Sequence, residues 1–316
     1  RSSAASDVYK RQVQRSGKIN IYRRNNKLAR YNPVKYTEAF MHKYKEKIMS
    51  GVFLLAACTS IIAVIIICLF LFANGIPAIK EIGIFKFITG TVWRPSNDIY
   101  GILPMILGSI YVTAGAILIG VPIGIFTAAF MAYFCPKKIY RVLKPAVNLL
   151  AGIPSVIYGF FGLVVVVPFT GNSMLTASLI LAVMILPSVI GVSETAIKAV
   201  PASYYEGALA LGATHERSVF FTVIPAAKSG IFAGVVLGIG RAIGETMAVM
   251  MVAGNSTGIP SSIFKGVRTL TTNIAIEMGY AQDLHREALI ATGVVLFVFI
   301  LIINISCSLL KRRNRN

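Results

Sequence analysis

The sequence predicts an all-α integral membrane protein with six transmembrane helices. Of its 316 residues, 56% are hydrophobic and only 14% are charged, which is too apolar for a water-exposed globular chain. Long stretches without a charged residue recur along the chain, and a helix needs about 20 residues to cross the hydrocarbon core of a bilayer. The chain nevertheless carries a net charge of +19. Membrane topology explains this charge more simply than nucleic-acid binding does.

The first two spans follow from two uncharged stretches. Residues 48–79 predict span 1 at about 50–73, and residues 99–136 predict span 2 at about 108–134. Gly101, Pro104 and Gly108 suggest a broken entry into span 2. Small residues then recur every four positions and lie on one face of that helix: Ala116, Gly120, Gly124 and Ala128.

The next uncharged stretch, residues 145–193, is long enough for two spans. The polar residues Thr170 to Ser173 mark the turn between them. We therefore expect span 3 at about 146–168 and span 4 at about 174–193. Gly152 and Pro154 in span 3, and Pro187 in span 4, are expected to break or bend these helices.

Two further spans complete the predicted membrane domain, residues 48–312. Span 5 is expected at about 229–253 and span 6 at about 288–310. Gly230, Gly234 and Gly238 recur at four-residue spacing in span 5, and we interpret them mainly as close helix packing. Exposure of backbone along a pore is the alternative.

Lysine and arginine indicate how these spans are oriented. The chain holds 31 of these residues, of which 24 lie in the N-terminal tail 1–47, the connections 136–144 and 194–228, and the C-terminal end that includes the tail 313–316. The alternate connections hold 6. The positive-inside rule therefore places both termini and the 194–228 loop in the cytoplasm. The tail 1–47 opens with RSSAASDVYKRQ, interpreted as a fragment end or cloning remnant, and is expected to be disordered or to lie on the membrane surface.

The remaining positive charge, Arg241, falls inside span 5. A charge within a span costs about 2.5 to 3.5 kcal/mol on insertion scales, and such residues usually face the bundle interior or an aqueous path. Glu245 is one helical turn later, so we expect the two side chains to share a face and to pair. A guanidinium can also bind phosphate oxygens through a bidentate fork. The hypothesis is that Arg241 meets an anion in the path and Glu245 balances it. The alternative is a purely structural ion pair.

The longest cytoplasmic connection, residues 194–228, is a candidate docking segment. Pro201 and Ser203 are typical of a helix start, Gly212 of a stop and Pro225 of the entry to span 5. A short helix held parallel to the membrane fits a groove of a cytoplasmic partner. His215 lies just after it, beside Glu216 and Arg217, and is interpreted as part of a solvated or partner-facing polar turn.

This segment resembles the EAA loop of ABC importer permeases, the coupling helix that sits on the ATPase subunit. The similarity rests on Glu206-Gly207-Ala208, on Gly212 four residues later and on Ile224-Pro225. Gly207 replaces the first alanine of the usual pattern, and Thr222 to Pro225 replaces its Ile-x-Leu-Pro end. The residues that the resemblance assigns to the coupling loop are Ser203, Tyr205, Glu206, Gly207, Ala208, Gly212, His215, Arg217 and Pro225.

Two further segments make the resemblance closer. Residues 151–162, AGIPSVIYGFFG, and residues 240–248, GRAIGETMA, are similar to those of phosphate importer permeases, and residues 246–249 are closer to the PstC type than to its PstA partner. The resemblance covers about residues 50–312. It implies a type I (MetI-like) importer permease fold in a bacterial inner membrane. It also implies a PstA-like second permease chain, two PstB-like ATPase subunits that bind ATP and a PstS-like extracytoplasmic phosphate-binding protein.

No cofactor or metal site is expected in this chain. It has no G-x-x-x-x-G-K-[ST] sequence for ATP, so it is not itself an enzyme. Its four cysteines lack metal-ligand spacing, and His285 gives at most weak metal binding. Three alternatives stay open: a sulfate or molybdate permease, a secondary transporter that uses Glu245 as an ion site, and a non-transporting membrane scaffold or sensor.

Overall fold

The computed structural model describes residues 33–313, with side chains from residue 46 to residue 309. The chain divides into two compact units, residues 1–67 and 68–316. In its described part, the first unit is the N-terminal portion of helix α2 (Pro33–Ile82). Residues 1–32 of the expected basic tail and residues 314–316 of the expected C-terminal tail lie outside the described residues. The expected tail 1–47 therefore overlaps the first turns of α2.

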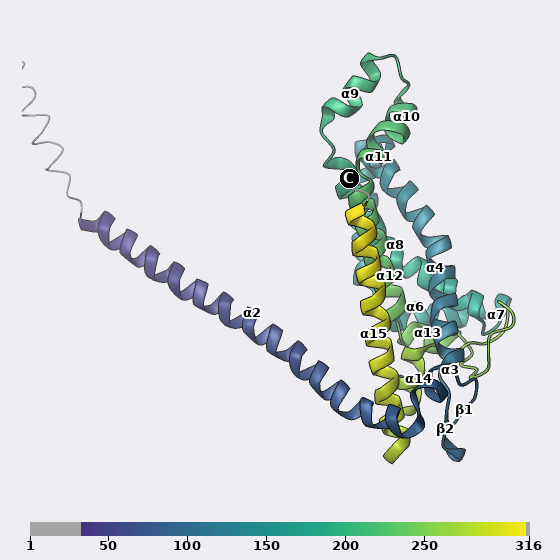
Figure 1. The fold of residues 1–316 in the computed structure, drawn as a ribbon. Helices are drawn as coiled ribbons and strands as arrows, with labels where there is room; N and C mark the ends of the chain where they lie inside the picture. Colours follow the sequence, from purple (N-terminus) through teal and green to yellow (C-terminus); the bar gives the residue numbers. More distant parts are fainter. Residues whose placement is uncertain (1–32, 314–316) are drawn as a thin grey trace, which may run out of the picture. The chain divides into compact units, whose positions relative to one another are not determined.

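The second unit is a helical bundle with a small hairpin (Figure 1). Its long helices are α4 (Leu103–Ala129), α8 (Met174–Lys198), α12 (Lys228–Gly244) and α15 (Asp283–Arg313). Short helices and the hairpin connect them: α3 (Ile84–Thr89), β1 (Trp93–Arg94), η1 (Pro95–Asn97), β2 (Ile99–Tyr100), α5 (Lys137–Gly152), α6 (Ser155–Phe161), α7 (Val167–Thr170), α9 (Ala202–Ala210), α10 (His215–Ser218), α11 (Ile224–Ala226), α13 (Met247–Val252) and α14 (Leu270–Glu277). Three π-helical turns lie within this series: η2 (Phe130–Phe134), η3 (Gly162–Val166) and η4 (Val219–Val223).

Within the described residues, four helices are long and apolar enough to cross a membrane: Glu46–Ile82, Leu103–Phe134, Met174–Lys198 and Asp283–Leu309. Two bent helix pairs bring the possible number of spans to six. The first pair is Lys137–Gly152 with Ser155–Thr170, bent by 97°, and the second is His215–Ala226 with Lys228–Gly244, bent by 70°. The predicted all-α membrane architecture is confirmed.

Some of the prolines and glycines interrupt these helices, and others do not. The chain breaks at Ile153 and Pro154 as expected, and Gly171 takes a φ of 70° in the expected turn before α8. Helix α8, in contrast, runs through Pro187 without a break. Helix α4 likewise begins at Leu103 without the broken entry that was expected. A proline inside an otherwise well-packed span therefore did not suffice to interrupt it.

The start of span 5 was predicted correctly, since α12 begins at Lys228, but its end was wrong. Instead of one helix over 229–253, α12 stops at Gly244, and residues 247–252 form the separate short helix α13. Helical structure also begins earlier, at His215, and bends before Lys228. The prediction used hydrophobicity alone, and the apolar residues beyond Gly244 belong to a second helix with its own start.

Helix α8 is the centre of the bundle, since it packs against both α4 and α12. Glycines permit both contacts. A Cβ atom added to Gly124 of α4 would lie 2.7 Å from the Val189 side chain of α8, and one added to Gly230 of α12 would collide with Ala196. The small-residue series in spans 2 and 5 are therefore packing surfaces, as small residues are in many membrane helix pairs.

The two ends of the second unit differ in structure. Helices α9 and α10 lie at one end, which we call the α9 end, and the β1–β2 hairpin lies at the other, the hairpin end (Figure 1). In the hairpin, Trp93 pairs with Tyr100 and Arg94 with Ile99. An apolar cluster at this end joins the hairpin to α3, α4, α14 and α15, with Phe87, Ile102, Met105, Leu270 and Leu289 fully buried.

Candidate functional site

The break between α12 and α13 positions both residues of the predicted anion path. Helix α12 ends at Gly244, and Glu245 takes extended backbone angles, with φ of −71° and ψ of 129°. The Glu245 carboxylate then accepts a hydrogen bond of 3.2 Å from the backbone N–H of Ala248, in the first turn of α13. A carboxylate is favoured there because a helix start presents unpaired N–H groups.

Arg241 and Glu245 do not form the ion pair that we expected. Residues four apart face each other only on a continuous helix, and here the helix ends between them. Among the residues that the structure describes, Arg241 is half-buried and its guanidinium makes neither a hydrogen bond nor an ion pair. The site therefore contains a partly buried positive charge whose hydrogen-bond donors are unused.

A second broken helix packs against this junction. Helix α5 ends at Gly152, α6 begins after Pro154, and the Tyr158 hydroxyl donates a 2.8 Å hydrogen bond to the Leu150 carbonyl across the bend. Tyr158 is buried. Gly159 allows α6 to approach α13 so closely that an added Cβ would lie 2.9 Å from the Ala248 backbone.

Helix α14 holds the junction from the hairpin end. The hydroxyl of Thr271 donates a 3.0 Å hydrogen bond to the backbone carbonyl of Glu245, which the end of α12 leaves free. Thr269 forms a capping box with Thr272 at the start of α14 and so fixes this helix start. Three helices thus define the position of the Glu245 backbone.

The expected coupling segment forms a compact, largely exposed projection at the α9 end. Helix α9 starts after Pro201 and ends before Gly212, whose φ of 85° favours glycine. Ser203, Glu206 and Gly207 are exposed. Leu211, which directly follows α9, is 92% exposed. The predicted start and stop of this helix are confirmed within one or two residues.

Several coupling-loop residues act inside the projection rather than on its surface. The Tyr205 hydroxyl and the Nδ1 atom of His215 are 2.6 Å apart, and the His215 ring lies edge-on to Phe134 at 4.6 Å. His215 was expected in a solvated or partner-facing turn, but it is half-buried and links α10 to α9 and to η2. Thr214 caps α10 by accepting from the N–H of Arg217. Ala208 is half-buried, and Pro225 lies in α11.

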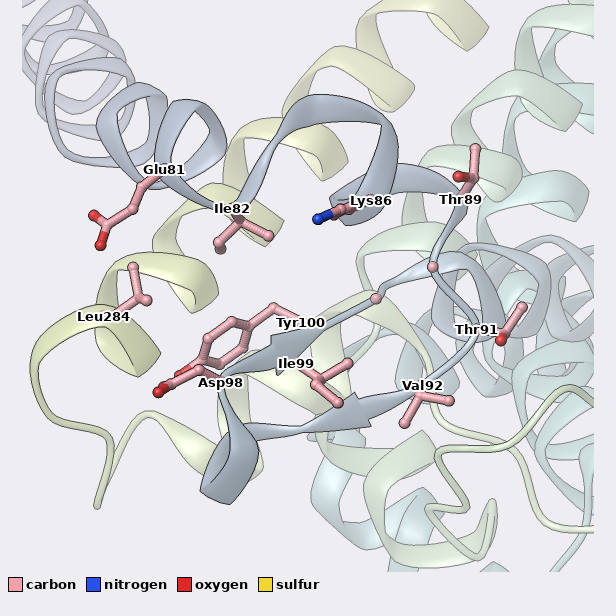
Figure 2. A pocket seen from close by; sticks show the side chains of 12 residues that line it. Glu81, Ile82, Lys86, Thr89, Thr91, Val92, Asp98, Ile99, Tyr100 and Leu284 are labelled. Atoms are coloured by element: carbon pink, nitrogen blue, oxygen red, sulfur yellow. The ribbon is translucent and has the colours of Figure 1, made fainter.

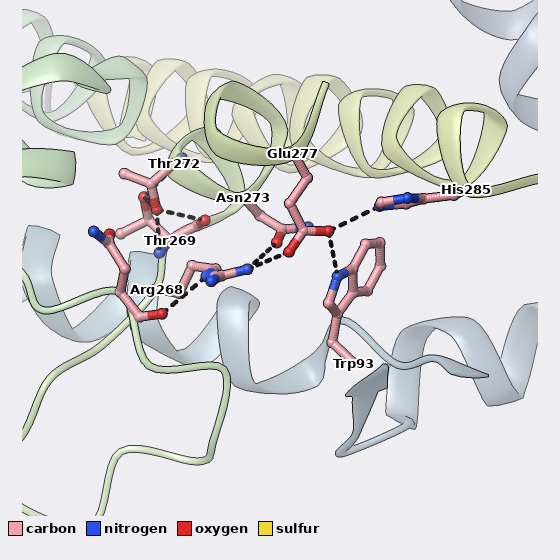
Figure 3. Close-up of polar contacts among 8 residues, drawn as sticks. Trp93, Arg268, Thr269, Thr272, Asn273, Glu277 and His285 are labelled. Carbon is pink, nitrogen blue, oxygen red and sulfur yellow. Dashed lines mark hydrogen bonds and ion pairs between the residues drawn. The ribbon is translucent and has the colours of Figure 1, made fainter. Parts of the chain in front are cut away.

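Sequence reasoning missed a buried polar cluster at the hairpin end (Figure 3). Glu277 of α14 is its centre, with a side chain only 7% exposed. One of its oxygens accepts from Arg268 at 2.5 Å, and the other contacts His285 at 2.8 Å and the indole N–H of Trp93 at 2.8 Å. Arg268 also donates to the Asn273 side chain at 3.1 Å. The charged residues of the 254–287 loop were the only sequence signal. Arg268 and His285 lie within nine residues of Glu277, whereas Trp93 is 184 residues away.

A cavity of about 800 Å³ opens next to this cluster, between α3 and β2 (Figure 2). Its lining includes Glu81, Lys86, Asp98 and Tyr100. The Tyr100 hydroxyl donates to Asp98 at 3.2 Å. Burial of this phenol, followed by the hydrogen bond to Asp98 and the negative charges of Asp98 and Glu277, raises the pKa of Tyr100 to about 12. Among the described residues, no group of three or more His, Cys, Asp or Glu side chains is arranged to hold a metal ion.

Comparison with known proteins defines the class of this chain. Residues 120–316 match the family described as binding-protein-dependent transport system inner membrane component. The matched segment is more than half of the chain, so the chain belongs to this family. A solved structure of the MetNI methionine ABC transporter in an inward-facing conformation has the same fold, with a TM-score of 0.54 and 20% identity over 71% of this chain and 99% of that one.

Within this family the chain belongs with the PstC-type permeases. It is 38% identical to the phosphate transport system permease protein PstC of Mesorhizobium japonicum, over 74% of this chain and 80% of that protein. It is 33% identical to the probable PstC of Methanocaldococcus jannaschii, over 75% of this chain and 84% of the relative. The probable ABC transporter permease protein YqgH of Bacillus subtilis is 40% identical, over 80% of this chain and 88% of the relative.

Proposed function

We propose that this chain is the PstC-like permease subunit of an ATP-driven importer for inorganic phosphate and forms half of the translocation path. The observation that carries the proposal is Arg241, a half-buried guanidinium with unused donors at the junction of two broken helices. Its PstC-type relatives are named as phosphate transport permeases.

The chemistry of the junction suits a transient contact with an oxyanion. A guanidinium presents a planar fork of N–H donors that matches two phosphate oxygens. A positive charge in a membrane span is costly, and such charges usually mark substrate pathways. The Glu245 carboxylate already accepts a hydrogen bond from the start of α13. It therefore fixes the junction beside the arginine and does not neutralise it.

Arg241→Lys tests this role. Lysine keeps the charge and loses the fork, so we expect the initial rate of radiolabelled phosphate uptake to fall roughly tenfold or more, equivalent to about 1.4 kcal/mol. Uptake is measured in cells that lack other phosphate importers, with the amount of the chain in the membrane held equal. The matched control is Arg94→Lys, an exposed arginine in the hairpin, for which uptake should be unchanged.

Undiminished phosphate uptake by Arg241→Lys would sink the anion-contact role. Uptake of sulfate at a rate equal to that of phosphate by the unaltered complex would instead favour a broader oxyanion permease. Uptake driven by an ion gradient in vesicles that contain this chain alone would favour a secondary transporter.

The energy for import is proposed to come from a separate polypeptide. The chain has no P-loop sequence, so it is a non-catalytic subunit and ATP is bound by a PstB-like ATPase dimer. The exposed projection made by α9 and α10 is the proposed contact with that dimer. A PstA-like second permease completes the path, and a PstS-like binding protein delivers phosphate at the hairpin end.

Orientation follows from the same assignment. The α9 end carries the connections rich in lysine and arginine, which favours the cytoplasm for that end and for both termini. The hairpin end then faces outward from a bacterial inner membrane. ATP-driven closure of the ATPase dimer would move the coupling segment, from about Ser203 to Arg217, and with it the membrane helices as semi-rigid bodies.

Glu206→Lys tests the docking of the coupling segment. Glu206 is exposed near the centre of α9, and a reversed charge there should weaken attachment of the ATPase roughly tenfold or more. The measurement is the amount of ATPase subunit that co-purifies with the tagged chain, together with phosphate-stimulated ATP hydrolysis. Glu287→Lys, an exposed carboxylate at the hairpin end, is the matched control. Normal attachment and normal hydrolysis in Glu206→Lys would contradict the assignment.

A further inference from the structure

A second buried carboxylate lies at the α9 end, and neither the anion path nor the docking surface uses it. Glu194 of α8 is 2% exposed, yet it is surrounded by three hydrogen-bond donors. Lys144 contacts one carboxylate oxygen at 2.6 Å, and Lys198 and the Tyr140 hydroxyl contact the other at 2.6 and 2.7 Å. Lys198 also donates to the Tyr140 oxygen at 2.9 Å, so the four side chains form a closed network.

This network joins the end of α8 to α5. Glu194 and Lys198 belong to the last turns of α8, and Lys198 is followed after three residues by α9, the proposed coupling helix. Tyr140 and Lys144 belong to α5. A buried carboxylate that loses its partners costs several kcal/mol, so the end of α8 and the first half of α5 are expected to move together.

Helix α5 carries this constraint to the anion path. It ends at the 97° bend, where Tyr158 of α6 bonds back to the Leu150 carbonyl of α5. Gly159, the neighbour of Tyr158 in α6, packs on the Ala248 backbone of α13. A continuous set of contacts therefore runs from the start of the coupling helix, through Glu194 and α5, to the junction that holds Arg241.

The geometry points to Glu194 as a positioning residue that couples movement of α9 to the bend between α5 and α6. This inference rests on the proposed function, because it assumes that α9 is driven by an ATPase. Folding does not depend on the network alone, since Val147 of α5 is buried in an apolar cluster with Ile190 and Ile197 of α8. Loss of the charges should thus leave α5 packed but no longer firmly tied to the end of α8.

The test compares transport with hydrolysis in one preparation. The complex of this chain with its second permease and ATPase subunits is reconstituted into vesicles with the binding protein, and phosphate uptake and ATP hydrolysis are both measured. For Glu194→Gln and Lys144→Met we expect phosphate moved per ATP to fall about fivefold or more, within the range of known coupling changes. Binding-protein-stimulated hydrolysis should stay within about twofold, and Glu194→Asp, which keeps the charge, should recover part of the ratio.

Lys138→Met is the matched control, because Lys138 is an exposed lysine on the same helix. Its ratio of uptake to hydrolysis should equal that of the unaltered complex. An unchanged ratio of uptake to hydrolysis in both Glu194→Gln and Lys144→Met would overturn the inference. An equally large fall of this ratio in Lys138→Met would also overturn it. Should Glu194→Gln fail to assemble, Lys144→Met carries the test, since Lys144 is 30% exposed and its loss leaves Glu194 two partners.

A second measurement does not depend on the transported anion. Spin labels are placed at two exposed positions, Val142 of α5 and Met247 of α13, in a chain whose own cysteines are replaced. We expect addition of ATP to change the distance between the labels in the otherwise unaltered complex and to change it little in Lys144→Met. The same ATP-driven change in both complexes would overturn the inference. Failure of phosphate uptake in the unaltered complex would instead count against the proposed function.

Discussion

The hairpin end and the α12–α13 junction treat buried charge in opposite ways. At the hairpin end, the Glu277 carboxylate has Arg268, His285 and Trp93 as partners. At the junction, the half-buried Arg241 has no hydrogen bond or ion pair among the described residues. Fully paired charges tie elements together, whereas a charge with unused donors has binding capacity left for a ligand. The difference separates structural polar groups from the candidate site without reference to any relative.

The largest expected effect on stability follows directly from this contrast. Glu277→Gln leaves the half-buried Arg268 without its anion, which should destabilise the protein by about 3 kcal/mol. Arg241→Met removes a charge that is costly within a span and has no partner to lose, so this change should not destabilise the protein and is expected to stabilise it. Thermal unfolding of the purified complex in detergent measures both variants. Equal shifts in the unfolding temperature would remove the distinction that we draw between the two regions.

Two glycine-to-alanine changes are expected to have smaller effects on stability, and the two effects are opposite in sign. Gly124→Ala places a methyl group 2.7 Å from Val189, at the contact between α4 and α8, and should destabilise by about 1 kcal/mol or more. Gly240→Ala adds its methyl group to α12 where no atom lies within 4 Å. Alanine is the better helix former, so this change should stabilise by up to about 1 kcal/mol. The same unfolding assay distinguishes them, and destabilisation by Gly240→Ala would indicate that its backbone is closely approached.

The smallest expected effect is the pH dependence of Tyr100 at the hairpin end. Its pKa is raised to about 12, so the neutral phenol is favoured in the folded state. The resulting stabilisation is complete below the unfolded pKa of about 10 and is lost as the pH rises from 10 to 12. Unfolding temperatures measured across this range should therefore fall more steeply for the unaltered protein than for Tyr100→Phe. Parallel curves would show that Tyr100 does not contribute.

Much of the architecture could be predicted from the sequence because it depends on local composition. Uncharged stretches predicted the membrane helices. The small-residue series in α4 and α12 proved to be packing surfaces. Gly212 ended α9 where expected. Each of these signals acts within one helix or between neighbours in sequence. Pro187 shows the limit, since the same residue type that breaks the chain at Pro154 is accommodated within α8.

The candidate site was predicted less completely, for two physical reasons. Arg241 and Glu245 were expected to pair because a continuous helix was assumed, and the break at Gly244 removes that geometry. The Glu277 cluster depends on Trp93, 184 residues away in the chain, and no periodicity reports such a contact. In the Glu194 network, Lys198 is four residues from Glu194 on the same helix, but Lys144 is 50 positions away. Polar groups that meet only in the folded state give no local signal.

The end of α12 at Gly244 has a consequence for how long an anion would remain at Arg241. The last carbonyl groups of a helix carry a partial negative charge of about half an electron, and Arg241 lies in that final turn. If Arg241 takes the proposed role, its guanidinium would attract the anion while the end of the helix would oppose it. Such a balance favours a fast dissociation rate over tight retention, so the arginine is suited to momentary contact during passage and not to storage.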